Sequence, residues 1–86
     1  MGAKENIRAL LKEEQSRLKG VGPGAGHGDY EERLSGLMTA IGEAADEFGD
    51  ISAPLLDGVV REMMAIRADD WDAAREAVGD MLALLG

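Results

Sequence analysis

Residues 55–66, LLDGVVREMMAI, decide the fold of this chain. Seven of these twelve residues are large and apolar, and they recur at steps of three and four residues. This spacing is typical of one wide face of a helix, and the rest of any fold has to cover that face. At about 100° per residue, the apolar stripe stays in phase almost to the end of the chain. We expect the buried stripe to contain Leu56, Val60, Met63, Arg67, Trp71, Ala74, Val78, Met81, Leu82 and Leu85.

The chain is short, and its core is expected to be thin. It has 86 residues, with one Trp, one Tyr and one Phe, and much of its hydrophobic content is Ala. Apolar burial contributes about 25 cal/mol per Å², which in so small a domain barely exceeds the loss of conformational entropy. Association with a partner or with a second copy is therefore a natural source of further stability.

The charge is divided unevenly along the chain. The net charge is −8, but residues 1–20 carry +2 and residues 29–86 carry −10. An acidic body repels phosphate backbones, so direct binding to nucleic acid is not expected. The basic N-terminal segment can bind the acidic body or an acidic partner.

Cysteine is absent, which excludes disulfides, zinc–thiolate sites and thiol catalysis. The N-terminus has no signal-peptide pattern, and no apolar run approaches the roughly 20 residues that span a bilayer. We expect a cytoplasmic protein without a membrane segment.

The pattern predicts an all-α fold, a small bundle of four helices in a single domain, residues 1–86. The expected helices cover residues 3–19, 29–48, 52–68 and 70–85. A break at residues 68–70 is favoured, because one uninterrupted helix would be roughly 50 Å long. The alternative is that the third and fourth helices form one long kinked helix, which a dimer would have to cover.

The first helix is amphipathic and is tethered by a Gly-rich loop, residues 20–28, GVGPGAGHG. One face of this helix carries Ala3, Ile7, Leu10, Leu11, Glu14 and Leu18. The loop lacks the spacing of a phosphate-binding motif, and it contains the only histidine, His27. We interpret it as a flexible tether that lets the first helix fold onto its own body or exchange with a neighbouring chain.

Local signals predict where the helices begin. Asp29 is expected to cap the second helix, and Ser52 the third, with Pro54 in its first turn. Asp69 or Asp70 is expected to cap the fourth.

Gly42 lies on the edge of the buried stripe of the second helix. We infer a close helix crossing there, so that Gly42→Leu should destabilise the fold.

Four acids lie at helical positions i, i+3, i+4 and i+7, a spacing that predicts an acidic ridge on one face: Glu43, Asp46, Glu47 and Asp50. A di-iron bundle would also need two histidines, and the nearest calcium-loop pattern has Ile51 where a glycine is required. We therefore expect no metal and no cofactor, and interpret the ridge either as a solvated face or as a partner-binding surface.

The apolar C-terminal segment also has two interpretations, because Trp and Met are frequent both in cores and at interfaces. Either Trp71, Val78, Met81, Leu82 and Leu85 belong to the core, or they bind a partner.

No catalytic set is recognisable, so we expect a protein that is not an enzyme. The favoured hypothesis is a small acidic helical protein-interaction module, acting as an adaptor, a regulator or a self-associating assembly protein, with a homodimer as the expected oligomer. The alternative is an acidic inhibitor of a nucleic-acid-binding protein, such as a phage-encoded anti-defence protein. The candidate partner-binding residues are the five C-terminal side chains and the four acids named above.

Overall fold

The computed structural model describes residues 2–26 and 28–86, so His27 lies outside the described residues. The predicted all-α bundle is confirmed within this part of the chain. Its four long helices are α1 (Ala3–Leu18), α2 (Tyr30–Glu43), α4 (Ser52–Arg67) and α5 (Trp71–Leu84). No helix of the described residues is both long and apolar enough to cross a membrane.

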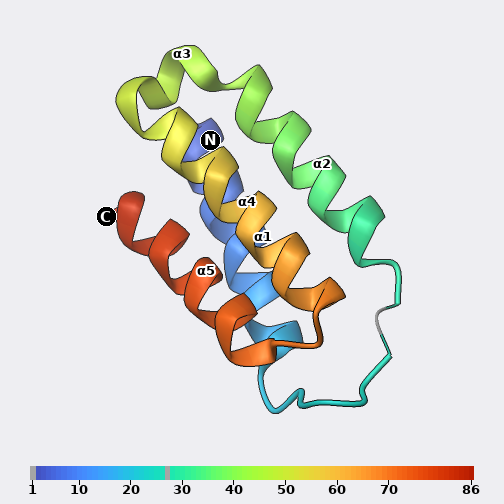
Figure 1. The fold of residues 1–86 in the computed structure, drawn as a ribbon. Helices are drawn as coiled ribbons and strands as arrows, with labels where there is room; N and C mark the ends of the chain where they lie inside the picture. Colours follow the sequence, from blue (N-terminus) through green and yellow to red (C-terminus); the bar gives the residue numbers. More distant parts are fainter. Residues whose placement is uncertain (1, 27) are drawn as a thin grey trace.

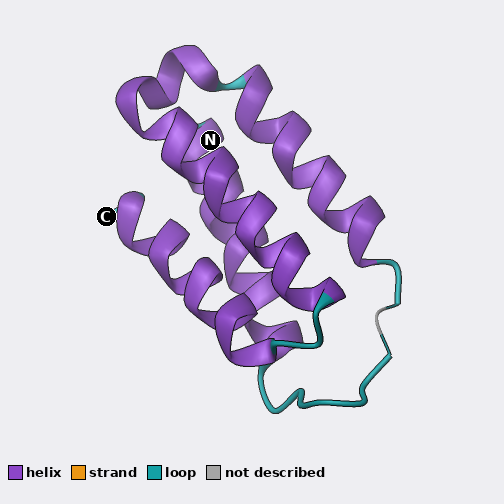
Figure 2. Cartoon of the chain, in the orientation of Figure 1, coloured by secondary structure: helices purple, strands orange, loops and turns teal. Residues whose placement is uncertain are grey.

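The helices run alternately up and down (Figure 1). Helix α4 lies between α2 and α5, and α1 lies behind α4 and packs on α5. The linker after α1 and the α4–α5 turn are at one end of the bundle, as Figure 2 shows. Of the neighbouring pairs in this ring, α1 and α2 touch least. The bundle is therefore closed on three sides and looser on the fourth.

The single helix predicted for residues 29–48 is wrong. The chain leaves α2 at Ala44, where φ is −104° and ψ is 16°, and continues as the short α3 (Ala45–Phe48) and the 3-10 turn η1 (Gly49–Ile51). This corner brings Phe48 into the core and reverses the chain toward α4. Gly49 ends α3 with a φ of 59°, a conformation that glycine adopts without steric cost.

The predicted cap at Asp29 is right in position, because Asp29 directly precedes α2, but it lacks the capping hydrogen bond; the predicted cap at Ser52 is wrong. The carboxylate of Asp29 accepts no backbone N–H, and instead accepts a hydrogen bond from Arg33 Nη1 at 2.9 Å. Ser52 is already helical, because η1 runs directly into α4 and supplies the preceding turn. The predicted break before the last helix is confirmed, since Asp70 Oδ1 accepts a hydrogen bond from the Ala73 amide at 3.1 Å.

The buried face of α4 is not the predicted stripe. Val60 is 40% exposed, and Leu56 and Met63 are only half-buried. The face that enters the core lies on the other side of the helix and consists of Leu55, Gly58, Val59, Glu62, Ala65 and Ile66. The apolar pattern misses this face because a glycine and a glutamate lie at its centre.

The close helix approach occurs at Gly58 and not at Gly42. A Cβ at Gly58 would lie 2.9 Å from Met81 Sδ and would also collide with Met81 Cγ on α5. Gly42 is exposed, and a Cβ there would meet nothing within 4 Å. The missing side chain of Gly58 is what lets α5 lie against α4.

The linker after α1 is fixed to the body of the same chain. Arg75 Nη1 donates to the carbonyl oxygens of Leu18 at 2.9 Å and Val21 at 2.7 Å. At the other end of the same helix pair, Arg8 Nη2 donates to the Leu85 carbonyl at 2.8 Å. The antiparallel helices α1 and α5 thus each supply an arginine that satisfies the last carbonyls of the other.

Asp69 joins the α4–α5 turn to this linker. It is the non-glycine residue with positive φ (58°) among the described residues, and it occupies the left-handed position at the end of α4. The amide of Asp70, the next residue, donates to the Ala65 carbonyl. This hydrogen bond is the one expected where a helix ends with a left-handed residue. The carboxylate of Asp69 accepts a hydrogen bond from Trp71 Nε1 at 2.6 Å and from the Gly24 amide at 3.0 Å.

We predict that Gly58→Leu lowers the free energy of unfolding by about 2 kcal/mol or more, because the added side chain overpacks the contact with Met81. The matched variant Gly42→Leu should change it by less than about 1 kcal/mol, since helix propensity improves and nothing is displaced. Thermal or urea unfolding of both variants measures the difference. An equal loss in the two variants would contradict the packing described here.

A second prediction concerns Asp69. Asp69→Ala should destabilise the fold by about 1–3 kcal/mol, because it removes two hydrogen bonds and leaves an alanine at positive φ. Asp69→Asn keeps an acceptor oxygen and tolerates that conformation, so it should lose clearly less. Urea unfolding followed by the fluorescence of Trp71 measures both, and wild-type stability of the alanine variant would rule out this role.

Candidate functional site

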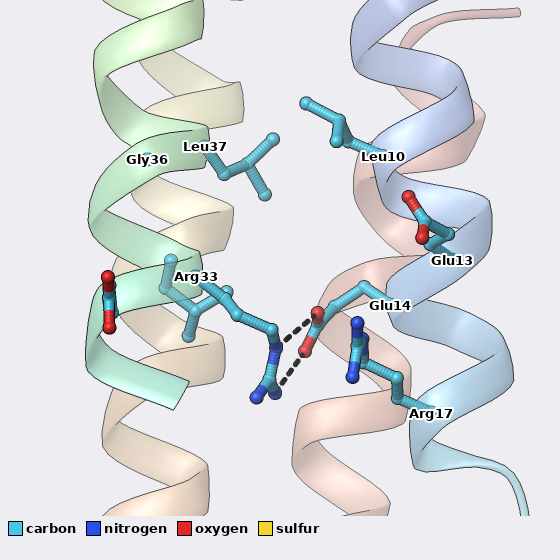
Figure 3. Close-up of a pocket in the computed structure, with 9 residues that line it drawn as sticks. Leu10, Glu13, Glu14, Arg17, Arg33, Gly36 and Leu37 are labelled. Atoms are coloured by element: carbon cyan, nitrogen blue, oxygen red, sulfur yellow. Dashed lines mark hydrogen bonds and ion pairs between the residues drawn. The ribbon is translucent and has the colours of Figure 1, made fainter. Parts of the chain in front are cut away.

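A groove lies along the loose side of the bundle, between α1 and α2, with a volume of about 400 Å³. We call it the α1–α2 groove, and Figure 3 shows it in close-up. Leu10 and Leu37 face each other across it, and Arg33 reaches from α2 toward Glu14 on α1. Its lining residues are Leu10, Glu13, Glu14, Arg17, Glu32, Arg33, Leu34, Gly36 and Leu37.

An ion pair with two hydrogen bonds spans the groove from α2 to α1. Arg33 Nε donates to Glu14 Oε2 at 3.2 Å, and Arg33 Nη2 donates to Glu14 Oε1 at 3.1 Å. The Glu14 side chain is buried, and the Arg33 side chain is partly exposed. The hydrogen bond to Glu14 raises the pKa of Arg33 above its usual value, so this guanidinium stays charged. Arg33 also donates to the exposed carboxylate of Asp29 through Nη1.

Glu62 of α4 lies in the core behind this pair and is 0% exposed. Neither of its carboxyl oxygens has a hydrogen-bond partner that donates to it among the described residues. The neighbouring Glu14 carboxylate can only accept, so it can pair with Glu62 only when Glu62 carries a proton. Together, Glu14, Arg33 and Glu62 form what we call the buried cluster.

Burial, most of all, together with a hydrogen bond to Glu14 and the charge of Glu14, raises the pKa of Glu62 to about 9. The positive charge of Arg33 acts in the opposite direction but is outweighed. At neutral pH, Glu62 is therefore a neutral acid that donates to the Glu14 carboxylate. The cluster then holds one anion, one cation and one neutral carboxyl group.

The cluster has the chemistry of a carboxyl pair that shares one proton, next to a fixed cation. Such pairs transfer protons in enzymes when substrate can touch them. Here Glu62 is fully covered by the bundle, and only Arg33 and Glu14 border the groove. The site that the closed fold presents is thus a groove lined by leucines and bordered by the Glu14–Arg33 ion pair.

The apolar candidate residues of the C-terminal helix lie in the core. Trp71, Val78, Met81 and Leu85 are all buried, and Leu82 is half-buried against the same cluster of side chains. Of the two interpretations that the sequence leaves open for these residues, the folded chain favours the core. Four of these five side chains offer no surface to a partner while the bundle is closed.

The acidic candidate residues are exposed but do not form the regular ridge that was expected. Glu43, Asp46, Glu47 and Asp50 are spread over the end of α2, α3 and η1, because the break at Ala44 interrupts the helical spacing. No group of three acids or histidines placed to hold a metal ion is found among the described residues. We call this exposed set the acidic corner.

Sequence reasoning missed the buried cluster. Glu14 shares a face with Ile7, Leu11 and Leu18, all of which are buried, and that spacing is the one signal that marks it. Glu62 is one turn from the buried Val59 and Ile66 and gives the same signal on α4. Glu14 was placed on the apolar face of the first helix but was not selected as a site residue, and Glu62 was left out of the stripe, because charged residues are seldom fully buried.

We predict that Glu62 makes stability depend on pH. Its pKa is raised from the ordinary 4.5 to about 9, so the folded state holds a proton that the unfolded state releases. The contribution of Glu62 to the free energy of unfolding is fully present below pH 4.5. It falls by about 1.4 kcal/mol per pH unit as the pH rises toward 9. Glu62→Gln keeps the shape without the titration, and its amide can donate to Glu14.

Relative to wild type, Glu62→Gln should therefore gain stability by several kcal/mol, on the order of 4, between pH 5.5 and pH 8.5. Urea unfolding at three or four pH values measures the gap between the two proteins. The control variant Glu76→Gln, at an exposed position on α5, should follow the wild-type curve. Parallel curves for Glu62→Gln and wild type would show that Glu62 is ionised in the fold.

Comparison with known proteins assigns no family to this chain. No family model, no curated protein and no solved structure matches it. The function has to be inferred from the groove, the buried cluster and the charge of the chain itself.

Proposed function

We propose that this chain is a non-enzymatic protein-interaction module, an adaptor or regulator that binds its partner in the α1–α2 groove. The observation that carries the proposal is that the loose side of the bundle is a groove with apolar walls. Leu10 remains 36% exposed on one wall, opposite Leu37 on the other. Clefts of a few hundred Å³ with apolar walls and few polar groups are the usual form of binding sites.

The thin core supports the same proposal. The exposed large apolar side chains of the described residues are Leu10 on α1 and Val60 and Met64 on α4, and of these Leu10 lines the groove. Covering Leu10 would remove apolar area from water, and would add to the stability of a small domain. We place this activity in the cytoplasm, with either another protein or a second copy, as a homodimer, in the groove.

The acidic corner favours a second candidate function, the acidic inhibitor of a nucleic-acid-binding protein. Its four carboxylates are exposed, and none of them forms an ion pair with a described residue. Unpaired charges at one end of a molecule attract a basic surface over a distance set by ionic strength.

Site-specific photocrosslinking distinguishes the two surfaces. We predict that a benzophenone amino acid in place of Leu10 yields a discrete adduct in cells that produce the protein. The same probe in place of Lys12 should not, because Lys12 is an exposed residue of the same helix that does not line the groove. Mass spectrometry of the adduct tells a second copy from another protein.

A probe in place of Asp50 reports on the acidic corner. An adduct from the Asp50 probe with none from the Leu10 probe would indicate that the partner binds at the acidic corner and not in the groove. Equal adducts from Leu10 and Lys12, or none from either, would contradict binding in the groove.

A further inference from the structure

The outward side of α4 is apolar, although no helix of the described residues covers it. In Figure 1, α4 lies at the front of the bundle, with α2 and α5 beside it and α1 behind it. Val60 is 40% exposed and Met64 is 62% exposed, while Leu56 and Met63 are half-buried. At about 100° per residue, these four side chains fall on the side of the helix that points away from the core. We call this side the outer face of α4.

Ion pairs border the outer face on both flanks. Arg67 Nη2 lies 3.6 Å from Glu31 Oε1 of α2, and Arg61 Nη1 lies 3.2 Å from Asp80 Oδ2 of α5. Around the helix, Val60 and Met64 fall between these two arginines, so the surface has an apolar centre and a charged rim. This is the usual anatomy of a surface that binds another protein.

Helix α4 is thus apolar on two opposite sides, one in the core and one in water. A helix that is apolar on every side is normally covered on every side, because apolar surface left in water forgoes the gain from burial. Methionine supplies two of the four apolar side chains of the outer face, and its flexible side chain adapts to the surface of a partner. The outer face therefore has the composition of a covered surface.

We propose that the outer face of α4 binds the same face of a second copy of this chain, with the two α4 helices antiparallel around a two-fold axis near Val60. This inference goes beyond the proposed function, because no residue of α4 lines the α1–α2 groove. A second copy on the outer face leaves the groove open to a different protein.

The charges on one flank of α4 favour a second copy as the occupant. Asp57 and Arg61 are one turn apart, and Arg61 Nε lies 3.4 Å from Asp57 Oδ2. A two-fold axis that reverses the helix places Asp57 of each copy opposite Arg61 of the other, so this flank is complementary to itself. A guanidinium has five N–H donors, which lets Arg61 bind carboxylates of both chains.

The outer face is also the place where two acidic chains repel each other least. Residues 29–86 contain four arginines and fourteen acids, and two of these arginines, Arg61 and Arg67, lie on α4. The acidic corner directly precedes α4, and Arg67 is its last residue. Antiparallel helices therefore bring the acidic corner of one copy toward Arg67 of the other, which offsets part of the repulsion.

The side of the bundle that carries the outer face is large enough for a dimer. The Cα atoms of the chain extend over 38 × 21 × 20 Å. A copy that covers most of one long side buries on the order of 800 Å² per chain, the area that each partner contributes to a stable interface of standard size. This burial would also add stability to a small domain with a thin core.

Sedimentation equilibrium of the full chain tests which surface binds the second copy. In the micromolar range, wild type should have twice the mass of the 9.1 kDa chain. Val60→Glu should raise the dissociation constant of the dimer at least about a hundredfold, because two carboxylates then face each other at the axis. Met64→Glu should act in the same direction, and both variants should keep their helical circular dichroism, because the two side chains are exposed in the single chain.

The matched control is Leu10→Glu, which makes the same kind of change at an exposed apolar residue of the groove. It should leave the dissociation constant of the dimer at the wild-type value. A wild-type protein that has the mass of one chain throughout this range, or a dimer that Val60→Glu leaves intact, would overturn the proposal.

Single cysteines test the orientation of the two helices, because the chain has no cysteine of its own. With the axis near Val60, Val60→Cys should form a disulfide with its copy under mild oxidation. Met64→Cys should not, because antiparallel helices separate the two copies of this residue by two turns, about 11 Å along the axes. Disulfides in equal yield at both positions would overturn the antiparallel arrangement.

The outcome for the outer face and the outcome for the groove are distinguishable. A crosslinked adduct of a different protein at Leu10, together with a wild-type monomer, would keep the interaction function and remove the α4 dimer. A dimer that Val60→Glu dissociates, together with no adduct at Leu10, would keep the α4 dimer and remove the groove as a binding site. A dimer that Leu10→Glu dissociates and Val60→Glu does not would place the second copy in the groove.

Discussion

The constraint on which the structure depends is the placement of a carboxyl group, Glu62, at the centre of the buried face of α4. Its neighbours on the same face are Leu55, Val59 and Ile66, so no water reaches it. A charged form there would cost several kcal/mol, and the fold avoids this by keeping a proton on it. Glu14 on α1 favours this proton, whereas the positive charge of Arg33 on α2 acts against it and is outweighed.

The same constraint explains why one side of the bundle is loose. Helices α4 and α5 meet closely, because Gly58 has no side chain where Met81 enters. Helices α1 and α2 meet instead through a long ion pair, which holds them farther apart than apolar side chains would. The Glu14–Arg33 contact thus accounts both for weaker packing between α1 and α2 and for the groove between them.

Much of the fold could be predicted from the sequence, and little of the site. Helical periodicity identified the four long helices and the break before Trp71, because these depend on local spacing and capping. The face of α4 was assigned wrongly, because Gly58 and Glu62 carry no apolar signal although both face the core. The groove depends on Glu14, Arg33 and Glu62 meeting from three helices, and no local pattern contains that information. The corner at Ala44 was missed for a similar reason, since the core position of Phe48 requires it.

The side chains of Arg8 and Arg75 tie α1 and α5 together at both ends of the helix pair. Arg8 secures the upper end of this pair through the Leu85 carbonyl, and Arg75 the lower end through the carbonyls of Leu18 and Val21. Neither helix can fray from its C-terminus without breaking a bond to the other. Local opening should therefore involve both helices as one cooperative unit, although they are at opposite ends of the chain. Slow hydrogen exchange should then be shared by the last turns of α1 and α5, although helix ends normally fray.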